Sequence, residues 1–128
     1  MKSQTIAGLG AALALSVALA PAPALAKDGD VIRVGSCSGS ADWKLKASPE
    51  DGRIEVEAEV DSNRNGQVWR WRLVHNGSIS ARGRSKTHAP SGSFEVRRVL
   101  VNLQGTDRIR FVARHPASGQ VCRGTVRF

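Results

Sequence analysis

Apolar and polar side chains alternate along several short segments of the chain. In residues 53–61 every second residue is aliphatic, and all the residues between them are charged. A similar period of two runs through residues 107–114 and 121–128. Successive side chains of a strand point to opposite faces, whereas a helix would mix the two sets. The three segments are therefore predicted to be strands with one face on a core.

Five further segments are less regular but lie between turn residues, and we predict strands there as well: residues 31–34, 42–47, 68–75, 78–82 and 94–101. Asn76-Gly77 separates two of them and is a strong hairpin signal, because both positions of a type I′ turn need a positive φ. Residues 48–52, 88–92 and 115–119 each pair a proline with a glycine, as turns do. Seven or eight short strands at this spacing predict an all-β, antiparallel β-sandwich.

Residues 69–72 read Trp-Arg-Trp-Arg, and period two places both tryptophans on one face of their strand and both arginines on the other. Burying an aromatic side chain removes on the order of 150–250 Å² from water. The reverse orientation would direct the arginines into the core, at a cost of about several kcal/mol for each unpaired charge. We therefore expect Trp69 and Trp71 in the core, and Trp43 as well. The alternative is a stacking platform for sugars or bases.

Residues 1–26 have the features of a cleaved secretory signal peptide. Lys2 supplies a positive charge, residues 6–20 are apolar, and Ala24-Leu25-Ala26 forms a cleavage signature. The apolar stretch is short of the roughly 20 residues that a bilayer span needs. The expected product is a secreted, extracellular protein cleaved near Ala26, without a membrane span, in which residues 27–128 form a single β-sandwich domain.

Two cysteines, Cys37 and Cys122, lie near opposite ends of residues 27–128. In an oxidising compartment an even pair of cysteines predicts a disulfide bond. The bond would join positions 85 residues apart. On the chain-entropy model a loop of that length contributes roughly 4–5 kcal/mol to stability. That is a large share of the net stability of a small domain, which is about 5–15 kcal/mol.

The order of the segments GRIEVEAEV, VWRWRLVHNG and SGSFEVRRVLVNLQGTDRIRFVARHPASGQVCRGTV resembles an immunoglobulin-like or fibronectin-III-like sandwich. In such folds a tryptophan on the third strand packs in the core, and a tight corner precedes a later strand. Trp69 and Trp71 correspond to that tryptophan strand, and Gly105-Thr106-Asp107 to the corner. The chain has no tyrosine, so a tyrosine corner is absent. Its cysteines would join an N-terminal segment to the last strand, unlike the usual pair between sheets.

The chain also resembles small secreted actinobacterial proteins of unassigned function. The segments that carry this resemblance are GSCSGSADWKLKASPEDGRIEVEAEVD and APSGSFEVRR. It extends over nearly the whole of residues 27–128, but it implies no activity.

Charge is distributed unevenly along the chain. Residues 27–61 hold five basic and nine acidic side chains, a net charge of −4, whereas residues 62–128 hold thirteen basic and two acidic, a net charge of +11. In such a sandwich the third, sixth and seventh strands form one sheet, and the resemblance gives these places to residues 68–75, 107–114 and 121–128. The outer face of that sheet would carry seven arginines without an acidic residue among them, and these are the candidate anion-binding residues: Arg70, Arg72, Arg108, Arg110, Arg114, Arg123 and Arg127. The opposite sheet would show a mixed ladder of Lys44, Lys46, Glu55, Glu57, Glu59, Glu95 and Arg97.

A planar guanidinium group binds phosphate or carboxylate through two parallel hydrogen bonds, which lysine cannot do. Fourteen of the nineteen basic residues are arginine. The leading hypothesis is therefore a secreted, non-catalytic binding module whose arginine face contacts an anionic extracellular partner. That partner would be a cell-wall polymer, an acidic polysaccharide or an acidic protein, and nucleic acid would bind without selectivity. The alternative is a basic face that serves solubility alone.

The residues do not favour catalysis, a metal or a cofactor. His75, His88 and His115 lack the spacing of metal ligands. His75 and His115 are expected as loop or rim residues at opposite ends of neighbouring strands, roughly 20 Å apart. The glutamates of residues 53–61 lie in line on one face rather than across a cleft, and the common hydrolase and nucleotide-binding motifs are missing. We therefore predict that the protein is not an enzyme.

Two other kinds of binding protein stay open. One is a small secreted inhibitor that presents the loop at residues 88–92 or at residues 115–119 to an extracellular enzyme. The other is a carbohydrate-binding module that uses Trp43, with or without the other two tryptophans.

Overall fold

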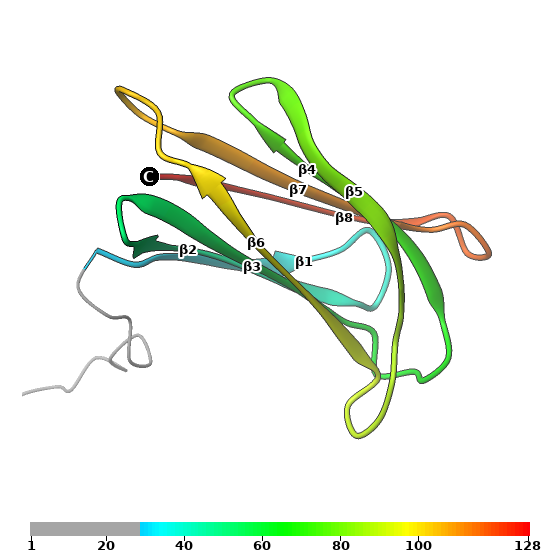
Figure 1. The fold of residues 1–128 in the computed structure, drawn as a ribbon. Coiled ribbons are helices and arrows are strands. Elements are labelled where there is room, and N and C mark those ends of the chain that lie inside the picture. Colours follow the sequence, from blue (N-terminus) through cyan, green and yellow to red (C-terminus); the bar gives the residue numbers. More distant parts are fainter. Residues whose placement is uncertain (1–28) are drawn as a thin grey trace, which may run out of the picture.

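The computed structural model describes residues 29–128, and they form eight antiparallel strands in two layers (Figure 1). The predicted signal peptide lies outside the described residues. The strands are β1 (Val31–Ser36), β2 (Asp42–Glu50), β3 (Arg53–Asp61), β4 (Val68–His75), β5 (Ser78–Lys86), β6 (Ser93–Val101), β7 (Arg108–His115) and β8 (Gln120–Arg127). The predicted fold class, an all-β antiparallel sandwich of seven or eight strands with one disulfide, is confirmed. None of the elements formed by residues 29–128 is a helix long and apolar enough to cross a membrane.

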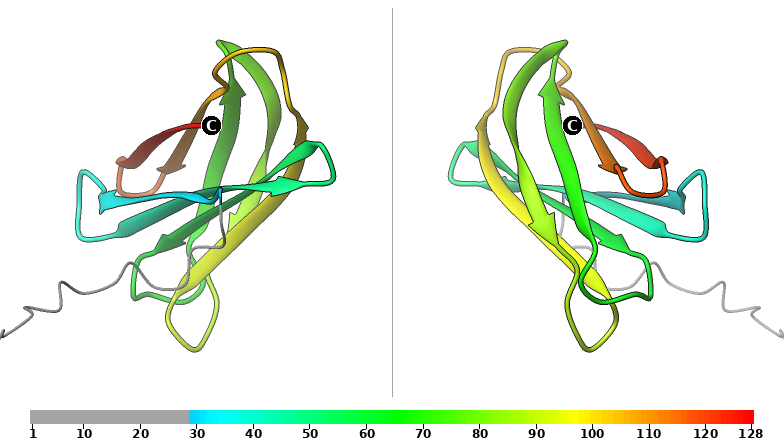
Figure 2. Two further views of the ribbon diagram at one scale, coloured as in Figure 1. Left: turned by 90° about the vertical axis from the view of Figure 1, so that its left-hand side faces the viewer. Right: turned by 90° about the vertical axis from the view of Figure 1, so that its right-hand side faces the viewer.

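The strands are divided into two four-stranded sheets. One has the order β1-β2-β3-β6 and the other the order β5-β4-β7-β8. The predicted grouping is confirmed, because β4, β7 and β8 are neighbours in the second sheet. Figure 2 shows that the strands of the two sheets cross at an angle, so the sheets are stacked face to face without being parallel.

Alternating side chains from both sheets fill the core. Trp69 is fully buried, and Trp71 is 6% exposed, so the prediction that both tryptophans face inward is confirmed. Trp69 packs against Phe94 of the opposite sheet, with ring centroids 6.3 Å apart. Trp43 also packs against the core but is partly exposed at its margin.

Strand β5 is longer than predicted, because the alternation continues past Arg82 through Gly83 to Lys86. Strand β4 extends alongside it as far as Val68, which is paired with Lys86, and supplies hydrogen bonds to this extra length. Glycine is required at position 83 by close packing, since a Cβ there would lie 2.8 Å from the Trp71 ring. A glycine inside a strand often marks such a close approach.

The predicted disulfide joins Cys37, just after β1, to Cys122 in β8. It does link the two sheets, although through other strands than the usual pair of such folds. Hydrogen bonds next to it fix the same junction. Ser38 donates from its backbone N to Val121 O at 2.8 Å, and the Ser38 hydroxyl accepts from Val121 N at 2.8 Å. The Gln120 side chain accepts a hydrogen bond from Ala41 N at 2.7 Å. This part of the β8 edge is therefore covered by residues 37–41.

Candidate anion-binding face

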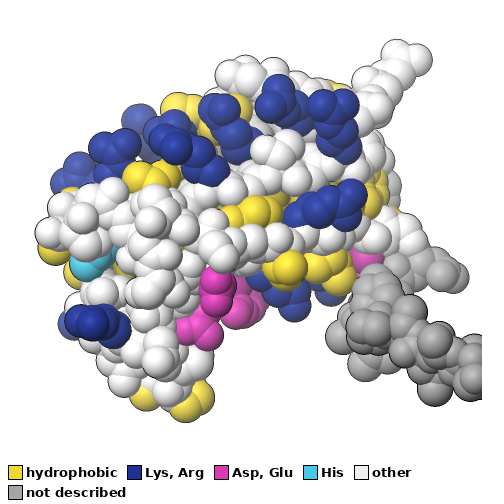
Figure 3. Space-filling model, turned by 180° about the vertical axis from the view of Figure 1, so that it is seen from behind, with side chains coloured by type: hydrophobic (Ala, Val, Ile, Leu, Met, Phe, Trp, Pro, Cys, Tyr) yellow, Lys and Arg dark blue, Asp and Glu magenta, His cyan; other side chains and the backbone are white. Residues whose placement is uncertain are grey.

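The outward side of the sheet β5-β4-β7-β8 carries basic side chains on all four strands. We call it the arginine face and define it by ten residues: Arg70, Arg72, Arg82, Arg84, Lys86, Arg108, Arg110, Arg114, Arg123 and Arg127. All ten are exposed. Figure 3 shows the basic side chains gathered along one side of the molecule, with apolar atoms between them and acidic side chains below.

Strand register arranges these arginines in rows across the sheet. Arg70 on β4 lies between Arg84 on β5 and Arg114 on β7. Adjacent strands are about 4.8 Å apart, so three guanidinium groups project from backbone positions within about 10 Å.

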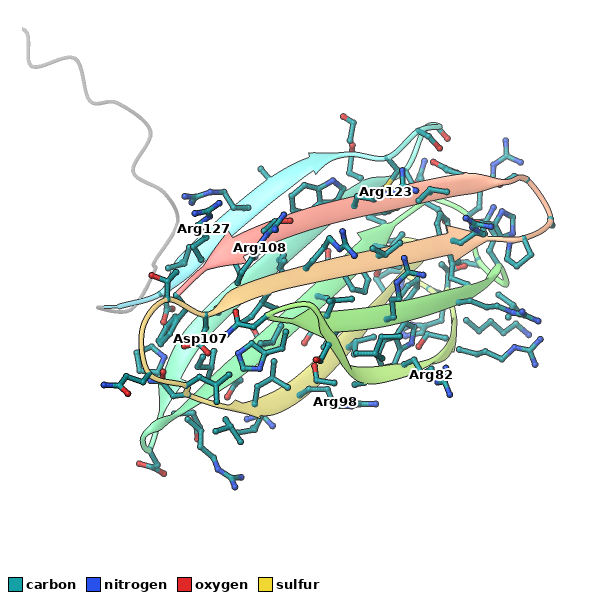
Figure 4. The ribbon with its side chains drawn as sticks, turned by 90° about the horizontal axis from the view of Figure 1, so that it is seen from above. Arg82, Arg98, Asp107, Arg108, Arg123 and Arg127 are labelled. Carbon is teal, nitrogen blue, oxygen red and sulfur yellow. A yellow bond between two sulfur atoms is a disulfide. The ribbon has the colours of Figure 1, made fainter. Side chains whose placement is uncertain are left out.

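A second row and a shorter pair complete the pattern. The next row runs from Arg82 through Arg72 and Val112 to Arg123. At the other end of the sheet Arg108 is paired with Arg127 (Figure 4). Like charges on neighbouring strands repel, so each row is electrostatically unfavourable in the absence of an anion.

The structure brings together all seven arginines that the sequence singled out, and it adds Arg82, Arg84 and Lys86. Arg82 was missed because the strand predicted at residues 78–82 was not assigned to this sheet, whereas Arg84 and Lys86 lie beyond the predicted end of that strand. The signal was present in the sequence, since residues 82–86 read Arg-Gly-Arg-Ser-Lys and alternate with period two. The face is therefore wider than predicted and includes the whole of β5.

Within residues 29–128, no carboxylate forms an ion pair with the arginine face. Of the two acidic residues that follow position 62, Asp107 is fully buried and contacts His75, with 2.6 Å between the Asp107 carboxylate and His75 Nε2. The other is Glu95, on the opposite sheet. The charges of this face are left to solvent or to a partner.

The opposite sheet has charges of both signs, as the mixed ladder predicted, and some of them form ion pairs. Arg97 donates a hydrogen bond to the Glu55 carboxylate at 2.6 Å. Lys46 lies 3.8 Å from Glu57 and 3.5 Å from Asp30. The two sheets therefore differ in kind, since one is a paired surface of mixed sign and the other an unpaired basic surface.

The ion pair of the mixed sheet shifts the titration of its members. The hydrogen bond from Arg97 lowers the pKa of Glu55 from 4.5 to about 2. The same contact raises the pKa of Arg97. Partial burial, with the neighbouring Glu55 carboxylate, raises the pKa of Glu57. Glu55 therefore stays ionised over nearly the whole pH range, which holds this pair together.

The arginine face contains a shallow hollow of about 460 Å³ over its centre. Its apolar lining includes Val112, which is 6% exposed, and Ile79. Six arginines surround it: Arg70, Arg72, Arg82, Arg84, Arg114 and Arg123. An anion in this hollow would have guanidinium donors on all four strands around it, and hydrogen bonds between charged groups are stronger than those between neutral ones.

A second hollow, of about 430 Å³, continues from the first toward one end of the sandwich. Arg70 and Arg84 line both hollows. Among residues 29–128, the rest of the second lining carries no Lys, Arg, Asp or Glu. It comes from two loops, the start of β4 and the end of β7: Gly66, Gln67, Val68, His115, Pro116 and Ala117. Arg108 and Arg110 lie away from both hollows and line a separate one of about 80 Å³.

His75 and His115 lie at strand ends, and the strand register separates them, whereas His88 lies in the β5–β6 loop. His75 is paired with Ile109 at one end of β7, and His115 ends the same strand. The expectation of a loop or rim position is wrong for His115, whose side chain is 9% exposed and stacks on Trp69 with ring centroids 5.2 Å apart. Packing against the large indole buries it. Among residues 29–128, no group of three or more metal-binding side chains lies together.

Fold and surface together define a disulfide-linked β-sandwich with one unpaired basic sheet face. No protein-family model matches the chain, and no curated protein or solved structure gives a significant match to it.

Proposed function

We propose that the protein is a secreted, non-catalytic binding module whose arginine face contacts an anionic extracellular partner. The observation that carries this proposal is the set of ten basic side chains on one sheet face, with which no carboxylate of residues 29–128 forms an ion pair. Nine of the ten are arginines. Arginine is the side chain best suited to bind phosphate or carboxylate through two parallel hydrogen bonds.

Electrostatics supports a partner with many charges. Arg70 lies between Arg84 and Arg114 on the two neighbouring strands. Arg72 lies beside Arg82. Repulsion within these rows is relieved when an anion lies across them, so a polyanion gains both from new contacts and from the loss of repulsion. Cell-wall polymers, acidic polysaccharides and acidic proteins are partners of this kind.

The proposed location is outside the cell, after cleavage of a signal peptide near Ala26. The Cys37–Cys122 disulfide is compatible with such an oxidising compartment. We further propose that residues 27–128 are one domain of the immunoglobulin-like or fibronectin-III-like kind, and that the chain is related to the small secreted actinobacterial proteins that it resembles. The strand order β5-β4-β7-β8, opposite a sheet that contains β3 and β6, supports the first of these proposals.

The test is to measure binding of oxidised residues 27–128 to purified wall polymer and to duplex DNA over a series of salt concentrations. A specific site predicts an affinity that falls steeply with salt and differs between the two polymers, because each released counterion adds to the slope. Arg72→Gln with Arg110→Gln should weaken binding by about tenfold or more. The matched control is Arg33→Gln with Arg53→Gln, which removes the same charge from exposed residues of the other sheet. Absence of binding at low salt would refute the proposal.

A second candidate, an inhibitor that presents a loop, is favoured by the β5–β6 loop at residues 88–92. This loop is held in shape by its own hydrogen bonds, since Gly92 N donates to His88 O at 3.0 Å. The buried Ser62 hydroxyl donates to Gly92 O at 3.1 Å. Charge reversal at Arg70, Arg72, Arg108 and Arg110 separates the two functions, because it abolishes polyanion binding and leaves loop-based inhibition largely intact.

A further inference from the structure

The two hollows on the arginine face form one elongated path. The first lies over the centre of the sheet, and the second lies between the β3–β4 and β7–β8 loops. They meet at Arg70 and Arg84, which are paired across neighbouring strands and line both. A compact anion would occupy one hollow, whereas a chain molecule can occupy both.

The linings of the two hollows differ in charge. Six arginines surround the first hollow. Beyond the shared Arg70 and Arg84, the second is lined by the uncharged residues Gly66, Gln67 and Val68 and by the His115–Ala117 turn. An occupant that follows this path places its charges in the first hollow and at the shared pair. Beyond that pair it has a neutral, polar or aliphatic part.

Exposed aromatic rings are missing along this path. The two rings that border the hollows, Trp71 and His115, are 6% and 9% exposed. Proteins that hold single-stranded nucleic acid stack the bases on exposed aromatic side chains, with a gain of about 1–3 kcal/mol for each base. The described residues of this face offer no such platform, so the units between the charges of the ligand need not be aromatic.

Resting on the proposed function, we propose that the arginine face binds a single-chain polyol phosphate, meaning phosphodiester groups joined by short, non-aromatic polyol units. Its phosphates bind the guanidinium groups around the first hollow and at the Arg70–Arg84 pair. A polyol unit lies in the second hollow, against Val68 and Ala117. The chain therefore runs along β4 toward the loop end of the sandwich.

The test uses two end-labelled probes with the same number of phosphates, an oligo(glycerol phosphate) and an oligothymidylate, with inorganic tripolyphosphate as a compact anion. Fluorescence anisotropy at several salt concentrations measures the dissociation constant of each labelled probe, and tripolyphosphate is measured as an unlabelled competitor. We expect the oligo(glycerol phosphate) to bind about tenfold or more tightly than the oligothymidylate. Because each neutralised phosphate of a single strand contributes about 0.7 to the slope of log affinity against log salt, the slopes count the phosphates bound.

Two matched double variants test the path. Arg70→Ser with Arg84→Ser removes two charges from the residues shared by the hollows, and Arg108→Ser with Arg127→Ser removes two charges from the far end of the same face. The first pair should weaken binding of the oligo(glycerol phosphate) at least about tenfold more than the second. Equal losses would overturn the proposed path, because attraction to the net charge alone predicts equality.

A third variant tests the second hollow without changing charge. Ala117→Trp adds a bulky ring to an exposed turn residue at this hollow. It should weaken binding of the oligo(glycerol phosphate) and leave tripolyphosphate binding as it was. An oligothymidylate that binds as tightly as the oligo(glycerol phosphate) refutes the polyol phosphate but leaves the proposed function standing. If neither probe, nor wall polymer, binds at low salt, the proposed function itself fails.

Discussion

Gly124 on β8 lies against the six-membered ring of Trp43 on β2, and a Cβ added at this glycine would fall well inside the contact distance of that ring. On β1, a Cβ at Gly35 would lie 2.7 Å from the same indole. The ring is therefore bordered by two strands, one in each sheet, at positions where a side chain cannot fit. The two sheets meet at this margin through a tryptophan and a glycine.

Gly124→Ala should accordingly destabilise the protein by about 1–3 kcal/mol, the usual cost of overpacking a closely packed site. The sign of this change in stability is informative. Where alanine fits without strain, replacing glycine by alanine stabilises a protein by about 0.4–1 kcal/mol, because it lowers the conformational entropy of the unfolded chain. Urea denaturation of oxidised protein measures the difference. Thr125→Ala, at the next and partly exposed position of β8, is the control and should change stability little. A stabilised Gly124→Ala variant would show that the indole moves aside freely.

The disulfide gives a second prediction about the same margin. Cys37→Ala with Cys122→Ala removes a link between residues 85 positions apart. On the chain-entropy model the loss is roughly 4–5 kcal/mol. Denaturant unfolding of the double variant, compared with the oxidised and the reduced parent, measures it. A loss below about 1 kcal/mol would mean that the hydrogen bonds of Ser38 and Gln120 hold the β1–β2 loop on β8 by themselves.

The strands, their inward and outward faces and the disulfide could be predicted from the sequence, because they depend on local alternation and on a single pair of cysteines. The bounds of β3 and β4 agree with the predicted ones, whereas β5 runs past its predicted end at Arg82, through Gly83 to Lys86. What made Gly83 compatible with a strand was the Trp71 ring beside it, which is a contact made in the folded chain.

The rows of the arginine face could not be predicted from the alternating pattern either, because they also depend on contacts made in the folded chain. Alternation assigns Arg70 to an outer face, but it does not set the register that places Arg70 between Arg84 and Arg114. Register depends on which strands become neighbours and how they are offset. The same limit explains His115, which is expected from the sequence in a loop or at the rim, whereas the Trp69 ring stacks on it and buries it.

The third prediction concerns the Glu55–Arg97 pair and low pH. The pKa of Glu55 is about 2 in the folded protein, below its ordinary 4.5, so its ionised form is favoured by folding. This contribution is fully present above pH 4.5 and is lost as the pH falls toward 2. Arg97→Leu should therefore raise the pKa of Glu55 toward its ordinary value, and a carboxyl NMR titration of both proteins measures it. An unchanged Glu55 pKa would show that Arg97 is not the cause.

Buried Asp107 provides the fourth prediction. Its carboxylate contacts His75 and accepts a hydrogen bond from Leu103 N at 3.2 Å. Removing a partner from a buried polar group costs about 1–3 kcal/mol, and more when the group is charged. His75→Ala should therefore destabilise the protein by at least about 1 kcal/mol in urea denaturation. His88→Ala, at an exposed histidine, is the matched control and should stay within about 0.5 kcal/mol of the parent.

The last prediction uses tryptophan fluorescence, because the three indoles differ in exposure. Trp69 is fully buried, Trp71 is 6% exposed, and Trp43 is partly exposed. A polar quencher such as iodide should therefore reach Trp43 far more readily than the other two, and Trp43→Phe should remove most of the quenching of the folded protein. Buried indoles also emit at shorter wavelength, so the remaining emission should be blue-shifted relative to the parent. Strong quenching that persists in Trp43→Phe would place Trp69 or Trp71 in contact with solvent, and it would reopen the stacking platform that their burial argues against.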